Sequence, residues 1–425
     1  MEKKEYDVAV IGAGPAGLAA AIATKKQGAG RVVIIERDFR LGGILEQCIH
    51  TGFGLKYFGE ELSGPEYAAR FIKVLEELDI DILLDTMVLS IEGEQHIIHA
   101  ANKTGAVSIH AKAIILSMGC REKTRAALCI PGSRPAGIYT AGTAQRLCNV
   151  QNHLVGKNIV ILGSGDIGMI MARRMTLEGA SVKAVIEVMP YLAGLTRNRV
   201  QCLDDFNIPL YLSHTIVDID GKLRVKKVTV AKVDENRRPI AGSEFDIECD
   251  TVLLSVGLIP ENEISKSAGV VLDGVTRGPV VDNCMMTSVR GIFACGNVVH
   301  VNDLVDNVSN ESELAGRNAA DYAIESFDEN AGLTGVSAGE HVRYVVPQNI
   351  ENDKVNSKVN LYFRVTDPMR DVTIRAVAGD KVLYNKKKQI VNPGEIESIS
   401  IDPAQIGGSG ASQITVSVTE NGEAR

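Results

Sequence analysis

Two stretches of the chain repeat one order of elements: an apolar strand, a glycine-rich turn, a helix with an apolar face, and a second apolar strand. The first is YDVAVIGAGPAGLAAAIATKKQGAGRVVIIE, residues 6–36, and the second is KNIVILGSGDIGMIMARRMTLEGASVKAVIE, residues 157–187. Gly12 to Glu36 spans 24 positions, and so does Gly163 to Glu187. The equal spacing predicts an internal duplication.

The remaining segments follow other patterns. Residues 65–78 place apolar side chains at helical spacing after a Ser-Gly start signal: Tyr67, Phe71, Ile72, Leu75 and Leu78. Residues 86–117 predict short strands, in MVLSI, HIIHA, VSIHA and AIILSMG. From about residue 335 the runs VNLYFRV, VTIRAV, KVLYNKK, ESISI and QITVSV are separated by turn residues. They predict a small antiparallel β-sandwich, whose default role is packing, dimerisation or partner docking.

Each repeat contains the pattern G-x-G-x-x-G and ends in a glutamate. The first glycine makes a tight turn, the second lets the backbone approach a pyrophosphate, and the third lets helix and strand pack closely. The helix N-terminus offers unpaired N–H groups to phosphates, and the glutamate can accept hydrogen bonds from a ribose diol. A single copy could be a structural turn, but two copies with both acids at the same spacing predict two dinucleotide sites.

The second repeat predicts a preference between nucleotides. Glu187 is followed by VMPY, which contains no base to compensate a 2′-phosphate. Like charges about 4 Å apart at an effective dielectric constant near 20 repel by about 4 kcal/mol. Half of that is roughly thirtyfold in affinity, so this copy is expected to prefer NAD(H) over NADP(H).

Composition limits the classes of function. The 425 residues suit two or three domains, and a net charge of -8 gives no basic surface for nucleic acid or membrane. The uncharged run at residues 8–24, which no other run exceeds in length, is shorter than the roughly 20 apolar residues of a spanning helix. The eight cysteines form no C-x-x-C pair, which argues against a metal site. We therefore expect a cytoplasmic protein without an export signal or a metal.

Five segments together resemble one superfamily over about residues 5–325. They are the two glycine-rich repeats, the motifs AIILSMGCREK and TVLLSVGLIPEN, and GIFACGN before a helix. The chain resembles the two-dinucleotide-binding flavoproteins, the pyridine nucleotide-disulfide oxidoreductase superfamily of glutathione and thioredoxin reductases. Within it, LGGILEQCIHTGFG and CGNVVHVNDLVDNVSNESELAG look like a narrower group. Members of that group accompany glycerol-3-phosphate-dehydrogenase-like flavoproteins and are related to subunits of opine oxidase and hydrogen cyanide synthase.

The resemblance implies an α/β fold with FAD-binding and NAD-binding Rossmann-like domains plus a small C-terminal all-β domain. The implied boundaries are 1–120 with 265–330 for FAD, 121–264 for NAD, and 335–425 for the β-sandwich-like domain. The FAD site would comprise Gly12, Gly14, Pro15, Ala16, Gly17, Glu36, Arg37, Gly42, Gly43, Val88, Gly119, Gly296 and Asn297. The NAD site would comprise Gly163, Gly165, Asp166, Ile167, Gly168, Glu187 and Gly257. Asn297 stands where the superfamily normally has an aspartate that holds the flavin ribityl chain.

The segment LGGILEQCIHTGFG bears on the chemistry. Disulfide reductases need two thiols beside the flavin, but this segment contains only Cys48. Cys48 and His50 are the candidate catalytic residues, and a role as buried filler is an equal alternative for them. Disulfide reduction is not expected.

The predicted function is an FAD-dependent oxidoreductase that passes hydride or electrons between NAD(H) and a second partner. That partner would be a companion flavoprotein dehydrogenase, such as a glycerol-3-phosphate dehydrogenase, or another electron donor or acceptor. One alternative is a stand-alone NADH oxidase or peroxidase that uses Cys48, and another is a mainly structural subunit of a dehydrogenase complex. A homo-oligomer is compatible with each of these hypotheses.

Overall fold

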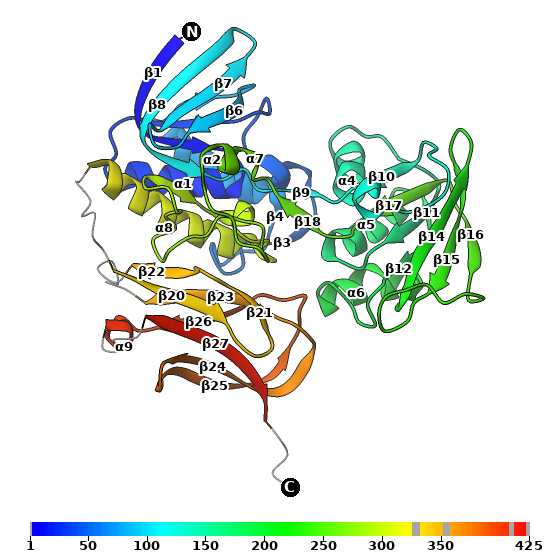
Figure 1. Cartoon of the computed structure of the whole chain (residues 1–425). Helices are drawn as coiled ribbons and strands as arrows, with labels where there is room; N and C mark the ends of the chain where they lie inside the picture. Colours follow the sequence, from blue (N-terminus) through cyan, green and yellow to red (C-terminus); the bar gives the residue numbers. More distant parts are fainter. Residues whose placement is uncertain (1, 325–331, 352–357, 408–411, 422–425) are drawn as a thin grey trace. The chain divides into compact units, whose positions relative to one another are not determined.

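A computed structural model describes residues 2–324, 332–351, 358–407 and 412–421. The chain forms two compact units, one of Met1–Cys120 with Pro260–Arg425 and the other of Arg121–Ile259 (Figure 1). We call them unit 1 and unit 2. The predicted three-domain boundaries stay a prediction, and residues 1, 325–330, 352–357, 408–411 and 422–425 of that scheme lie outside the described residues.

Unit 1 is built on a seven-stranded sheet. Its strands are β1 (Glu2–Ile11), β2 (Val32–Ile35), β5 (Asp81–Leu83), β6 (Met87–Glu92), β7 (Ile97–Asn102), β8 (Gly105–Leu116) and β19 (Ile292–Ala294). Their order is β5-β2-β1-β8-β7-β6, and β19 also pairs with β8. The predicted strands VSIHA and AIILSMG form one strand, β8, because the intervening Lys112 points to solvent and pairs with Asp7 at 2.8 Å.

Helices and short elements complete this part of unit 1. They are α1 (Pro15–Lys26), η1 (Gly43–Gln47), β3 (Thr51–Phe53), β4 (Leu62–Ser63), α2 (Gly64–Glu76), α7 (Glu263–Ser267), η3 (Gly296–Val298) and α8 (Val305–Ile324). The predicted helix start holds, since Ser63 and Glu66 form a reciprocal capping box. Helices α1 and α8 lie side by side (Figure 1), and a Cβ at Gly316 would stand 2.3 Å from Ala20 O. Only glycine permits this helix contact.

Unit 2 has a five-stranded parallel sheet between two covering layers. The sheet order is β10-β17-β11-β12-β13, and a second sheet has the order β14-β15-β16. The bounds are β9 (Cys120–Glu122), α3 (Arg125–Leu128), β10 (Ile138–Thr140), α4 (Ala141–Asn149), β11 (Asn158–Leu162), α5 (Asp166–Leu177), β12 (Ser181–Ile186), α6 (Thr196–Cys202), η2 (Asp204–Phe206), β13 (Leu210–Tyr211), β14 (His214–Gly221), β15 (Val225–Lys232), β16 (Phe245–Glu248), β17 (Thr251–Leu254) and β18 (Leu258–Pro260). Side chains along β11 point alternately to the two faces of the sheet. Ile159 and Ile161 pack against the helices, and Val160 and Leu162 pack against β14 and β15.

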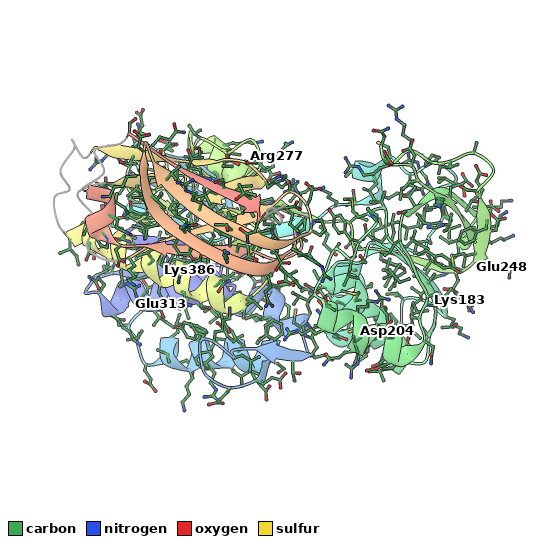
Figure 2. The ribbon with its side chains drawn as sticks, turned by 90° about the horizontal axis from the view of Figure 1, so that it is seen from below. Lys183, Asp204, Glu248, Arg277, Glu313 and Lys386 are labelled. Carbon is green, nitrogen blue, oxygen red and sulfur yellow. The ribbon has the colours of Figure 1, made fainter. Side chains whose placement is uncertain are left out.

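The C-terminal β-region, the described part of residues 332–421, belongs to unit 1. Its elements are β20 (Leu333–Ala338), β21 (Val342–Val346), β22 (Asn349–Glu351), β23 (Val359–Val365), β24 (Met369–Ala378), β25 (Lys381–Val391), β26 (Glu397–Ile401), α9 (Pro403–Gly407) and β27 (Gln413–Glu420). Two sheets, β22-β20-β27-β24-β25 and β21-β23-β26, bury a common apolar core. The sandwich is not purely antiparallel as predicted, since β20 and β27 run parallel. Figure 2 labels Lys386 on β25 of this region and Glu313 on α8 of the same unit.

Candidate functional site

The first glycine-rich turn joins β1 to α1. Gly12 has φ 104°, and a Cβ there would stand 2.6 Å from Ser117 O. A Cβ on Gly17 would stand 1.8 Å from Gly12 O, so both positions require glycine. At Gly14, in contrast, a Cβ would meet nothing within 4 Å. The turn therefore leaves open space beside the first residues of α1, which include Pro15 and Ala16.

Glu36 lies at the end of β2 beside that space. It is buried, its Oε2 accepts from Ala13 N at 2.7 Å, and its Oε1 accepts from Asp38 N at 2.8 Å. Each carboxylate oxygen keeps a lone pair for a ribose hydroxyl. Arg37 is exposed on the following turn.

Of the other predicted FAD residues, Gly42, Gly43 and Gly119 lie near the turn, whereas Val88 lies on β6. Gly42 donates its N–H to Ala13 O at 2.9 Å, and a Cβ on Gly43 would stand 2.8 Å from Gly14 Cα. Gly119 follows β8 with φ 71°, and no atom occupies its Cβ direction. Val88 is buried on β6, the edge strand of the sheet, where backbone groups on the outer side are unpaired by the ladder.

Gly296 and Asn297 follow β19. Gly296 donates its N–H to Glu311 Oε1 at 2.8 Å. Asn297 Oδ1 accepts from Asn302 N at 2.9 Å, and its Nδ2 lies 3.7 Å from Cys120 Sγ. The Asn297 amide is thus held at the carboxyl ends of β8 and β19.

Together these residues fit FAD. A dinucleotide binds at the carboxyl ends of parallel strands, with its pyrophosphate on a helix N-terminus. The open direction at Gly14, the carboxylate of Glu36 and the amide of Asn297 supply the space and the partners that a pyrophosphate, a ribose and a ribityl chain require.

The second turn joins β11 to α5 with matching geometry. Gly163 has φ 101°, and a Cβ on Gly168 would stand 2.6 Å from Gly163 O. Gly165 precedes α5, whose first turn contains Ile167. Buried Glu187 accepts from Ser164 N and Ser164 Oγ at 2.8 and 2.7 Å through Oε2 and from Met189 N at 2.8 Å through Oε1. In both copies the glutamate therefore accepts from the backbone N–H of the residue that follows the first glycine. It also accepts from the backbone N–H two residues after the glutamate.

The two copies differ at the first residue of the helix. Asp166 stands where the first copy has Pro15, and its Oδ1 accepts from Leu195 N at 2.8 Å and Asn198 Nδ2 at 2.7 Å. A Cβ on Gly194 would stand 2.8 Å from Asp166 N. The segment 193–198 is thus fastened over the N-terminus of α5, where a pyrophosphate would bind.

Gly257 follows β17 with φ 100° and faces Lys123, whose Nζ would stand 3.7 Å from a Cβ at that position. Gly257 O also accepts from Lys123 N at 3.0 Å. The predicted NAD residues of unit 2 therefore gather at the carboxyl ends of β11, β12 and β17.

Cys48 and His50 follow η1. Cys48 is half-buried, donates from Sγ to Ile44 O at 3.3 Å, and has its thiol pKa raised to about 12 by burial. His50 Nδ1 lies 3.0 Å from Thr51 O. Because a raised pKa keeps the thiol protonated, this geometry disfavours a reactive thiolate.

Sequence reasoning missed two acids and a serine that support the site. Asp306 is buried and accepts from Gly54 N at 3.1 Å and Lys56 N at 2.8 Å, so it clamps the segment after Cys48. Glu311 holds Gly296 and lies 3.0 Å from His300 Nε2. Ser117 donates to Ile11 O at 2.7 Å beside the first turn. Only Ser117 had a sequence signal, since it shares its motif position with Ser255.

No group of three or more His, Cys, Asp or Glu side chains that could hold a metal occurs among the described residues. In the same part of the chain, every helix is too short or too polar to cross a membrane.

Comparison with known proteins decides the family. Residues 6–319 match the model of the pyridine nucleotide-disulphide oxidoreductases. The chain belongs to this family. Its members use FAD and NAD(P)H, so the predicted class of enzyme, an FAD-dependent NAD(P)H oxidoreductase, is confirmed.

Two curated relatives have informative names. One of them, a subunit of opine oxidase from Rhizobium meliloti, is 24% identical over 314 residues, covering 69% of this chain and 58% of the relative. NADH dehydrogenase of Bacillus subtilis (strain 168) is 27% identical over 330 residues, covering 77% of this chain and 59% of the relative. The chain thus spans about three fifths of each.

A solved structure confirms the fold class. Thioredoxin reductase of T. acidophilum superimposes with a TM-score of 0.62 at 27% identity, covering 76% of this chain and 100% of the other. The family member therefore has the two-domain FAD/NAD fold, to which a C-terminal β-rich region is added.

Proposed function

We propose that the chain is an NADH-linked FAD oxidoreductase that exchanges electrons with a second redox protein. The observation that carries the proposal is the duplicated arrangement of turn and buried glutamate at Gly12–Glu36 and Gly163–Glu187. A structural subunit would need neither copy to keep an intact turn and a placed acid. Both copies keep them.

The residues of each copy have separate tasks. Gly12, Gly14, Gly17 and Glu36 bind FAD, and Asn297 binds its ribityl chain. Gly163, Gly165, Gly168 and Glu187 bind the nicotinamide nucleotide, and buried Glu187 disfavours a 2′-phosphate by charge repulsion. FAD held by these residues would supply two-electron chemistry toward a nicotinamide nucleotide. The protein binds and orients the two dinucleotides.

The second partner is proposed to be a companion flavoprotein dehydrogenase, with a glycerol-3-phosphate dehydrogenase as the leading candidate. The name of the opine oxidase relative supports a partner, because it describes one component of a larger enzyme. The peroxidase alternative requires a Cys48 thiolate, and burial opposes it by raising the pKa of the thiol to about 12.

Matched glycine variants test the assignment of the two sites. Gly14→Val and Gly165→Val each place a branched side chain in a turn. A Cβ meets nothing within 4 Å at Gly14, and at Gly165 its nearest neighbour is Ser255 Oγ at 3.4 Å, so both variants are expected to fold. Gly14→Val should purify without FAD, whereas Gly165→Val should keep FAD but lose its reduction by NADH.

The readouts are flavin absorbance per chain and stopped-flow bleaching by NADH. Retention of FAD by Gly14→Val would overturn the assignment of the first copy. Normal bleaching in Gly165→Val would overturn that of the second.

A further inference from the structure

Arg364 on β23 connects the C-terminal β-region to the segment after Asn297. It donates to Val301 O through Nη2 and to Pro393 O through Nη1, both at 3.1 Å, and it pairs with Asp303. Its Nε also donates to Tyr344 OH at 3.2 Å. The side chain is 13% exposed, so this pair is shielded from solvent and from salt.

Asp303 is held from the same side. Its Oδ2 accepts from Ile396 N at 2.7 Å, while Oδ1 binds the Arg364 guanidinium. Although burial disfavours the charged guanidinium, Asp303 and Tyr344 raise the pKa of Arg364 above its usual value. Residues of the C-terminal β-region thus bind Val301 and Asp303, which are the two neighbours of Asn302 in the sequence.

Asn302 connects these contacts to the turn at Gly296 and Asn297. Its backbone N–H donates to Asn297 Oδ1 at 2.9 Å. A backbone N–H can only donate, so the oxygen of the Asn297 amide must face Asn302 and its NH₂ group must face the Cys120 side. The orientation of the residue that would hold the ribityl chain therefore depends on where the 301–303 segment lies.

We propose that Arg364 is a positioning residue for the flavin site, which it orders by fixing the 301–303 segment against Asn297. This inference rests on the proposed binding of FAD at the first copy. It assigns the C-terminal β-region a role in cofactor binding, although the glycine-rich turns lie elsewhere in the chain.

A second line of contact attaches the C-terminal β-region independently. Gln348 donates its N–H to Val281 O and accepts from Val281 N through Oε1, both at 3.0 Å. Glu351 N donates to Asn283 Oδ1 at 2.6 Å. Loss of Arg364 should therefore leave the C-terminal β-region docked, and Gln348→Ala is a control that weakens docking without touching residues 301–303.

The experiment measures FAD affinity of the apoprotein by quenching of flavin fluorescence, in the full chain and its variants. Arg364→Gln should weaken FAD binding by about tenfold or more, since hydrogen bonds to charged groups are among the stronger ones. Arg364→Lys should recover part of the loss, and Gln348→Ala should change affinity less than about threefold. In the apoprotein, hydrogen exchange at the Asn302 amide should accelerate in Arg364→Gln.

A double-mutant cycle with Asn297→Ala separates positioning from general stability. If Arg364 acts through Asn297, adding Arg364→Gln to Asn297→Ala should weaken FAD binding little further. Additive losses, or unchanged affinity in Arg364→Gln, would overturn the inference. Failure of the parent chain to bind FAD would instead overturn the proposed function.

Discussion

At the scale of single residues, Glu36 and Glu187 each hold a turn in place, and we propose that each also binds a ribose. Each is buried and binds the residue after the first glycine of its turn. A buried carboxylate is tolerated because backbone N–H groups stabilise its charge. The same contacts place it where a ribose diol would lie, so the acid is structural before any ligand arrives.

Cys48 offers a residue-scale prediction. Because burial raises its thiol pKa to about 12, almost no thiolate exists at neutral pH. Cys48→Ser should keep FAD, keep rapid reduction by NADH, and retain dye-linked turnover within about twofold. Steady-state assays with an artificial dye, run beside assays with peroxide, check this expectation. Rapid peroxide reduction that disappears in the variant would show that Cys48 is redox-active.

At the scale of elements, the segment 193–198 and the N-terminus of α5 form a closed contact through Asp166. A pyrophosphate must approach this helix end, where the Asp166 carboxylate already holds two donors. Asp166→Asn keeps an acceptor but removes the negative charge, so NADH should bind about threefold to tenfold more tightly. The control is Asp204→Asn, since exposed Asp204, labelled in Figure 2, also lies in unit 2.

Titration of the bound flavin's reduction with NADH measures both variants. An unchanged affinity for NADH in Asp166→Asn would mean that the Asp166 charge does not oppose nucleotide binding beside segment 193–198. Weaker binding of NADH would mean that the Asp166 carboxylate assists the nucleotide.

Much of this element arrangement follows from sequence. Spacing from Gly12 to Glu36 and from Gly163 to Glu187 predicts both turns, because only a strand, a tight turn and a helix fit it. The two copies also match beyond their glutamates. Leu41-Gly42-Gly43-Ile44 follows Glu36 at the same sequence spacing as Leu192-Ala193-Gly194-Leu195 follows Glu187. Contacts such as Arg364 with Asp303 join residues 61 positions apart, and no local pattern encodes them.

At the scale of the whole molecule, docking of the C-terminal β-region also places a carboxyl group in an unfavourable site. Asp282 lies where residues 281–283 meet residues 348–351, and its Oδ1 accepts from Cys284 N and Met286 N at 2.8 and 2.9 Å. Burial, with a smaller contribution from Glu351, raises its pKa from 3.8 to about 7. The folded protein therefore binds this proton more tightly than the unfolded chain.

Stability should consequently fall as pH rises from about 4 to about 7, because the unfolded state binds fewer protons than the folded state in that window. Asp282→Asn should flatten this part of the profile and raise Tm more at pH 8 than at pH 4.5. Thermal unfolding of both proteins across this range checks the sign. An equal change of Tm at both pH values would show that Asp282 does not titrate there.

We propose that electrons pass through one flavin in this protein without a second redox group. Anaerobic titration of the purified, FAD-containing protein with NADH, followed at the flavin absorbance band, tests it most directly. One equivalent of NADH should bleach one flavin, since a hydride carries both electrons that the flavin accepts. NADPH should require roughly thirtyfold higher concentration, given the charge on Glu187. Consumption of two equivalents of NADH, or no bleaching at all, would contradict the account.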